Sequence, residues 1–237
     1  MRRLLLTLIA VLLLAQPAWA GQRATYVDKD GKKLTIEVTD DGNAIVTPDG
    51  QDQYGILRDG HFYLVGHENG ALHVARMEDM AAAFDHVLPP VFKQLFDMAA
   101  KNQSKSKLRI EPAGTRTIAG HEGQLYKVYG LKDDKPNEAT EMVLSKDPAL
   151  QPVGQAMTQF SISSVLLLAP LIGQAAGDMI TEMRTIFSYG APLDAGQFKL
   201  ASVETVAIPA SAAVLPGKPE TVDEIVAQLK ASSAPPK

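Results

Sequence analysis

Residues 33–60 read KLTIEVTDDGNAIVTPDGQDQYGILRDG, and this stretch decides the fold class. In Lys33–Val38 the apolar residues occupy every second position, which is the period of a strand with one buried face. Asp-Gly pairs follow at 41–42, 49–50 and 59–60, and Asn69–Gly70 continues the series. Such pairs favour tight turns because both residues accept a positive φ. We therefore predict an antiparallel meander, with strands near 23–28, 33–39, 43–47, 52–58, 61–66 and 71–76.

After this meander the apolar residues fall three and four positions apart, which predicts an amphipathic helix between 78 and 101. Pro89 and Pro90 lie in its middle, so we expect a kink or two helices. A second meander should follow, with strands near 107–111, 115–119, 124–129 and 139–145. The residues of the helical stripe are Met80, Phe84, Val87, Leu88, Val91, Phe92, Leu95 and Phe96.

A further helix should begin at Asp147 and Pro148, which are typical of an N-cap and of a first-turn proline. It leads into residues 162–176, the most apolar part of the chain beyond the N-terminal segment. This run is short for a membrane span and is interrupted by Pro170 and Gly173. We expect a buried or groove-covering helix and no stable membrane span.

The C-terminal part should return to strands at 185–193 and 197–208. Thr221 and Glu224 have the spacing of a capping box, which predicts a last short helix. Residues 232–237 should be frayed. Strands grouped in meanders, with helices inserted between them, predict an α+β domain over 21–231.

The first twenty residues have the three parts of a secretory signal peptide. Arg2 and Arg3 form the basic start, residues 4–15 are apolar, and Ala18, Trp19 and Ala20 form the small-residue cleavage site. The alternative, an uncleaved anchor, is disfavoured because the apolar run is shorter than the roughly 20 residues that span a bilayer. We expect cleavage after Ala20 and a soluble protein in the periplasm of a Gram-negative bacterium.

Composition narrows the function classes. Cysteine is absent, so neither a lipid-modified cysteine nor a disulfide is available, and hydrophobic burial must hold the fold together. The net charge is -4 and becomes more negative when the two N-terminal arginines are removed. No dense block of Lys and Arg remains, which argues against nucleic acid and against electrostatic docking on anionic membranes.

The residues that could carry chemistry do not form a recognisable site. His61, His67 and His73 do not share one strand because Asn69–Gly70 reverses the chain between them, so exposed strand histidines are favoured over a metal site. Ser104–Lys107 matches S-x-x-K, but its S-D-N and K-T-G partners are missing and it follows a helix. We predict no catalytic residue, no metal and no cofactor, and hence no enzyme.

Residues 115–128, TRTIAGHEGQLYKV, resemble the T-I-A-G-Y-x-C-x-x-Y signature of an exported bacterial family, the domain of unknown function numbered 4412. Residues 140–145 followed by Lys146–Asp147 resemble the strand, K-D and helix that come next in that family. Gly190–Leu193 resembles its closing G-x-P-L hairpin. Gly123 stands where the family has its cysteine, so any role of that cysteine is lost here.

The resemblance implies a fold similar to the periplasmic lipoprotein-carrier superfamily, a half-barrel in which a curved antiparallel sheet has helices across its concave face. The leading interpretation is non-catalytic binding or carriage of an apolar ligand, a lipid or a lipidated peptide. The alternative is a module that binds another envelope protein and no small molecule. The alternative for the methionines and other apolar residues of the helices is that they only fill the core. The candidate ligand-binding residues are Phe84, Leu88, Phe92, Met157, Leu167, Leu171 and Met179.

Overall fold

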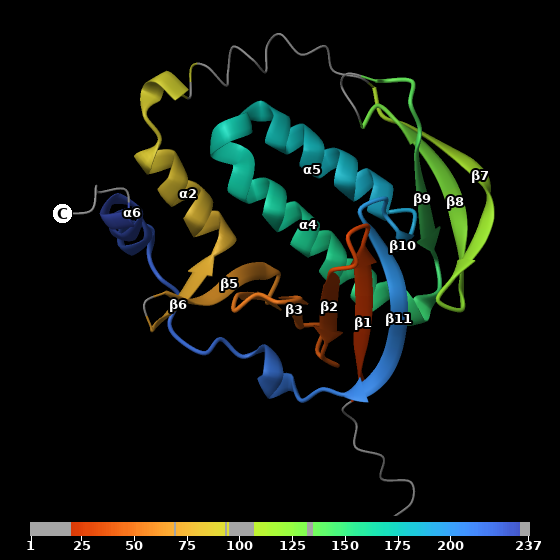
Figure 1. Cartoon of the computed structure of the whole chain (residues 1–237), viewed down its shortest axis with the longest axis horizontal. Helices are drawn as coiled ribbons and strands as arrows, with labels where there is room; N and C mark the ends of the chain where they lie inside the picture. Colours follow the sequence, from red (N-terminus) through yellow and green to blue (C-terminus); the bar gives the residue numbers. More distant parts are fainter. Residues whose placement is uncertain (1–19, 69, 93, 95–106, 132–134, 233–237) are drawn as a thin grey trace, which may run out of the picture.

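The computed structural model describes residues 20–68, 70–92, 94, 107–131 and 135–232 (Figure 1). Residues 1–19 of the predicted signal peptide, Leu95 and Phe96 of the predicted helical stripe, Ser104–Ser106 of the S-x-x-K motif and the tail 233–237 lie outside these residues. The first meander is confirmed, because six strands follow one another in antiparallel pairs. They are β1 (Ala20–Asp28), β2 (Lys33–Val38), β3 (Ala44–Pro48), β4 (Tyr54–Arg58), β5 (His61–Glu68) and β6 (Ala71–Arg76).

Five more strands extend the same sheet, and its order is β6-β5-β4-β3-β2-β1-β11-β10-β9-β8-β7. The long pairing of β1 with β11 joins the two halves. Because β6 and β7 are the two edges, the sheet is not closed. The added strands are β7 (Arg109–Ile118), β8 (His121–Tyr129), β9 (Thr140–Ser145), β10 (Ala191–Asp194) and β11 (Phe198–Ala207). The α+β class with a large antiparallel sheet is therefore confirmed.

In the described part of the chain, four α-helices accompany the sheet: α2 (Met77–Val87), α4 (Gln151–Ile172), α5 (Gln174–Phe187) and α6 (Val222–Ser232). The expected break at the prolines is confirmed, since α2 ends at Val87 and helical residues resume at Pro90. The apolar run 162–176 is not a helix of its own, because its first part is the second half of α4. Gly173, with φ +57, turns the chain directly into α5.

Two strand predictions need correction. The segment 185–193 is not one strand, since α5 continues to Phe187 and β10 contains only Ala191–Asp194. Thr185, Ile186 and Phe187 have strand propensity, but Ile186 is buried against β8 and β9, and this tertiary packing overrides propensity. The segments 107–111 and 115–119 form the single strand β7, whose register shifts between Pro112 and Thr115.

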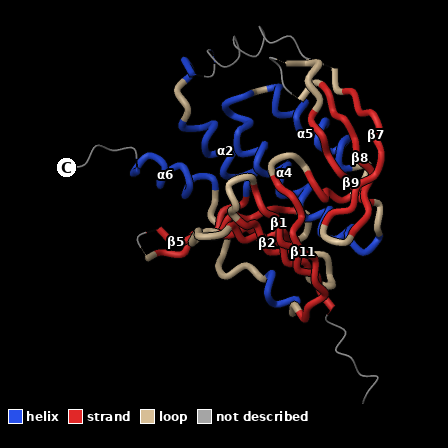
Figure 2. The backbone as a smooth tube through the Cα atoms, turned by 45° about the vertical axis from the view of Figure 1, so that its right-hand side comes forward, coloured by secondary structure: helices blue, strands red, loops and turns tan. Residues whose placement is uncertain are grey.

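The main core lies between the sheet and α4, which packs against β1, β2, β4, β5 and β10. Both tube and ribbon views show α4 and α5 inside the curve of the sheet, with β1 and β2 on one side and β7–β9 on the other (Figures 1 and 2). Strand alternation supplies a second cluster on the opposite face: Leu57 joins the main core, while its neighbour Ile56 packs with Val65, Val74 and Ala213.

The chain after β11 covers that second cluster and one sheet edge. The segment around Ala213 packs on the far face, and the backbone N–H of Glu220 donates to the carbonyl of Val74 on edge strand β6 at 2.8 Å. Then α6 packs against α2 through Ile225. Its capping box is confirmed, since Thr221 Oγ1 accepts from the Glu224 N–H and the Glu224 carboxylate accepts from the Thr221 N–H at 2.7 Å.

Candidate ligand-binding surface on the helical hairpin

The helical hairpin α4–α5 is the most apolar feature of the fold. Residues 148–177, which include all of α4, contain no charged side chain. The hairpin starts at the predicted N-cap, where the Asp147 carboxylate accepts from the Ala149 N–H at 2.9 Å. This bond, together with the contact from His121, holds the pKa of Asp147 below its ordinary value. By length and composition alone Pro148–Ile172 could cross a membrane, and 28% of its most apolar window is buried within the fold.

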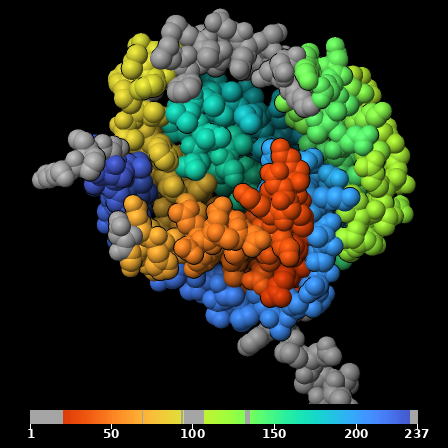
Figure 3. Space-filling model, in the orientation of Figure 1, coloured from red at the N-terminus to blue at the C-terminus, as the bar shows by residue number. Residues whose placement is uncertain are grey.

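The two halves of α4 lie in different environments. In the first half, Val153, Ala156 and Met157 are buried in the main core. In the second half, Ile162 and Val165 are still buried, but Leu168 is 46% exposed and Leu166, Leu167 and Leu171 are only partly buried. Figure 3 shows the hairpin, in teal, reaching the surface between α2, β1 and the strands β7–β9. The second half of α4 is therefore an apolar surface, and we call it, together with α5, the hairpin surface.

The hydroxyl groups of the hairpin do not offset this apolar character. Thr158, Ser161 and Ser164 of α4 donate to the carbonyl four residues earlier, at 2.7 to 2.9 Å. Thr181 and Thr185 of α5 do the same at 2.8 Å. A hydroxyl that bonds its own helix in this way is not free to donate to another partner. These five hydroxyls therefore add no free donor to the hairpin surface, whose charged groups are Asp178, Glu182 and Arg184 of α5.

The seven predicted ligand-binding residues occupy three different environments. Met157 is a core residue and Leu167 packs against the same core. Phe84, Leu88 and Leu171 are half-buried. Phe92 and Met179 are 47% and 39% exposed. The hairpin has two hollows, and none of these seven residues lines either of them.

The first hollow lies at the corner where α4 turns into α5. It is an open recess of about 650 Å³ with a mainly apolar lining. Its lining residues are Leu166, Ala169, Gly173, Gln174, Ala176, Gly177, Asp178 and Ile180. An acyl chain could lie in such a recess with one side still in contact with water.

The second hollow, of about 630 Å³, lies at the other end of the hairpin, where α4 begins and α5 ends. Lys146 and Arg184 contribute two cations to its wall. The remaining lining residues are Ser145, Gln151, Gly154, Gln155, Thr158, Gln159, Phe187, Ser188, Tyr189, Gly190 and Ala191. We call it the cationic groove. No sequence motif indicated it, because the two cations are far apart in the chain and only the antiparallel hairpin brings them to one wall.

Compared with family models, curated proteins and solved structures, the chain matches none of them. The resemblance of residues 115–128 to the exported family therefore depends on those residues themselves. In the structure they form the β7–β8 hairpin, with Ala119 and Gly120 at the turn. Gly123 lies on β8, and a side chain there would meet Val143 at 2.7 Å and Leu193 at 2.9 Å.

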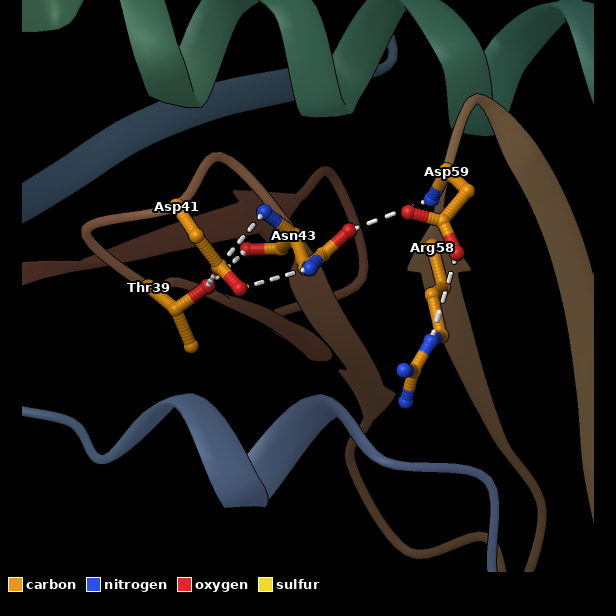
Figure 4. Close-up of polar contacts among 5 residues, drawn as sticks. All are labelled: Thr39, Asp41, Asn43, Arg58 and Asp59. Atoms are coloured by element: carbon orange, nitrogen blue, oxygen red, sulfur yellow. Dashed lines mark hydrogen bonds and ion pairs between the residues drawn. The ribbon is translucent and has the colours of Figure 1, made fainter.

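The most connected polar cluster lies elsewhere, at two turns of the first meander, and it is structural (Figure 4). The Asp41 carboxylate accepts from the hydroxyl of Thr39 and from Asn43 Nδ2, the latter at 2.9 Å. Asn43 Oδ1 in turn accepts from the backbone N–H of Asp59 at 3.2 Å, and Arg58 Nε reaches the Asp59 carboxylate at 3.4 Å. These bonds tie the β2–β3 turn to the β4–β5 turn.

The three strand histidines have separate surroundings. His61 lies 3.2 Å from Glu78 of α2, and His73 lies 2.6 Å from Glu220. His67 is exposed near the end of β5. Within the described ranges no three His, Asp or Glu side chains come together as metal ligands.

Proposed function

We propose that this protein is exported to the periplasm, where it binds an acyl chain of a lipid or of a lipidated peptide without catalysing a reaction. The observation that carries the proposal is the hairpin surface, an uncharged helix whose second half is apolar and half-exposed. Exposed apolar patches of this kind often mark sites that a ligand or a partner protein covers. A curved sheet with helices on its inner side is also what the lipoprotein-carrier resemblance implies, and we propose the half-barrel of that superfamily as the architecture.

Export is supported by the place where β1 begins. Cleavage after Ala20 would leave Gly21 as the first residue, and Gly21 is buried and paired with Val206 of β11. Cleavage there removes the pair of Ala20 with Ala207 and leaves the other eight pairs of β1 with β11 in place. N-terminal sequencing of the protein from a periplasmic fraction tests this, and a chain that still starts at Met1 in the membrane fraction would contradict it.

A second candidate function is docking of another envelope protein on the same surface. It is favoured by one observation: both hollows of the hairpin are open at the molecular surface. An enclosed cavity suits a small ligand better. A search for co-purified lipid separates the two candidates, because an interaction module would carry none.

The test uses the full-length secreted protein and one exposed leucine on each of two elements. Leu168→Glu places a charge on the hairpin surface, whereas Leu72→Glu changes a leucine of similar exposure, 40%, on β6. Neither side chain is buried, so both variants should keep a free energy of unfolding within about 0.5 kcal/mol of the wild type. Any difference in binding then reflects the position of the charge.

Native mass spectrometry of protein purified from periplasm should detect bound lipid, and a fluorescent fatty acid should bind to the purified protein. We expect Leu168→Glu to weaken that binding by about tenfold or more, because it removes apolar contact and would desolvate a carboxylate. Leu72→Glu should bind as the wild type does. Absence of any acyl binding by the wild type, or equal losses in both variants, would refute the proposal.

A further inference from the structure

The cationic groove suggests what the far end of the ligand is. We propose that it binds an oxyanion, a carboxylate or a phosphate ester, at the head of the acyl ligand, with the chain lying along the α4–α5 seam. This inference rests on the proposed function and names the class of ligand that the same hairpin takes.

The charge of the groove favours an oxyanion. Lys146 and Arg184 line the groove, and none of the other lining residues is acidic. Among the residues that the structure describes, neither cation forms an ion pair. Asp147 is adjacent to Lys146 in the chain, but its carboxylate is taken up by the Ala149 N–H and by His121, 3.3 Å away. The groove therefore has two cations that form no direct ion pair with a described carboxylate.

The groove also contains hydrogen-bond donors that suit an oxyanion. Gln151, Gln155 and Gln159 line the groove with side-chain amides along the first half of α4. The hydroxyls of Ser145 and Thr158 are already used, since they donate to the carbonyls of Glu122 and Gly154 at 2.6 and 2.7 Å. Amides and cations are the groups that bind carboxylate and phosphate oxygens in proteins.

The groove and the apolar hollow share one stripe of α4, on which the buried Ile162 lies between them. On α4 the groove is lined by Gln151, Gln155 and Thr158, and the hollow at the corner by Leu166 and Ala169. These residues recur at helical spacing, so they lie on one stripe of α4 facing the seam with α5. Thr158 and Leu166 are about 12 Å apart along the helix axis, at about 1.5 Å per residue. A dodecyl chain spans that distance, so its head and tail could reach the two ends of one seam.

The groove would attract an anionic headgroup only at short range. The chain as a whole has a net charge of -4, which repels anions at long range. A preference for an anionic ligand would therefore have to come from the groove. Because Lys146 and Arg184 are exposed, the preference should also weaken as salt is added.

The experiment is calorimetric titration of the full-length secreted protein with three probes. Dodecyl phosphate is the anionic amphiphile, the glycerol monoester of dodecanoic acid is its uncharged counterpart, and inorganic phosphate is the headgroup alone. We expect dodecyl phosphate to bind about tenfold more tightly than the glycerol ester, as two exposed charge contacts would give. Inorganic phosphate should bind far more weakly than either.

Three variants assign the preference to the groove. Lys146→Gln and Arg184→Gln should each lower it by about threefold and leave binding of the glycerol ester unchanged. The matched control is Lys230→Gln on α6, which lies on the opposite side of the molecule from β9 and β10 (Figure 1). This variant should bind all three probes as the wild type does.

The possible failures are distinguishable. Equal binding of both amphiphiles by the wild type would overturn the headgroup inference and leave acyl binding standing. Inorganic phosphate binding as tightly as dodecyl phosphate would show a site for a free anion, which also overturns it. Binding of neither amphiphile would reject the proposed function and this inference together.

Discussion

At Gly154 the hairpin packs tightly against the sheet, and this contact allows a prediction about one added methyl group. A Cβ atom at this position of α4 would lie 2.6 Å from the Cβ of Ala191 and 2.8 Å from its Cα on β10. Real Cβ atoms do not approach backbone so closely, so α4 would have to move away from β10. At Gly177 of α5, by contrast, a Cβ atom would meet nothing within 4 Å.

The two Gly→Ala changes therefore have the same effect on helix propensity and different effects on packing. Each replaces glycine within a helix by alanine, which favours folding by about 1 kcal/mol. At Gly154 the added methyl group also overpacks the junction with β10, at a cost of about 1 to 3 kcal/mol. We expect Gly177→Ala to stabilise the protein and Gly154→Ala to be less stable than Gly177→Ala by about 1 to 3 kcal/mol.

Thermal unfolding followed by circular dichroism measures this difference. For a chain of this size 1 kcal/mol corresponds to about 2 to 4 °C in Tm, so the two variants should melt several degrees apart. Denaturant titration provides a second measurement, with unchanged slope if the denatured state is unaffected. If Gly154→Ala were as stable as Gly177→Ala, the contact between α4 and β10 would not be as described.

Three further predictions concern turns, a helix cap and acid. Gly120 has φ +82, a conformation that strains most side chains. Gly120→Val should therefore lower the free energy of unfolding by about 1 to 3 kcal/mol, and Gly120→Asn by clearly less. A valine variant with the Tm of the wild type would contradict the β7–β8 hairpin turn. Thr221→Ala should cost about 1 kcal/mol and Thr221→Ser little, as seen by chemical denaturation; equal losses would mean that the hydroxyl does not cap α6. The Thr39 hydroxyl is the largest cause that holds the pKa of Asp41 below its ordinary value of 3.8. The stabilisation from Asp41 is therefore present above about that pH and is lost as the pH falls through the lower pKa of the folded state. Asp41→Asn should weaken the dependence of stability on acid, as measured by circular dichroism. An unchanged midpoint of acid unfolding would speak against this.

The local part of the fold was predictable because its signals are local. Alternation in Lys33–Val38 and the Asp-Gly pairs place the strands and turns of the first meander within two or three residues. The capping box at Thr221 and the N-cap at Asp147 are likewise contained in a few consecutive residues, and both form as predicted. Each of these features depends on neighbours in the chain, so tertiary packing had little to override.

The pairing of β1 with β11 and of β9 with β10 was not predictable, since these partners are distant in sequence. The same reason explains the error at 185–193. Thr185 and Ile186 favour strand by themselves, whereas burial of Ile186 against Tyr126 and Leu144 keeps them in α5. The cationic groove was not predicted because Lys146 and Arg184 line one groove only after the hairpin and the sheet have formed.

Folding alone does not account for the second half of α4. The first half already anchors the helix, because Val153, Ala156 and Met157 are buried in the main core. A helix with one core-facing stripe tolerates charged residues on its opposite side, and most surface helices have them. Yet Leu168, at 46% exposure, has no charged neighbour anywhere on α4, and nearby hydroxyls are bonded back to the helix. Ile162 and Val165 keep one face of this half in contact with the fold, and we propose that the acyl ligand covers the other face, around Leu168.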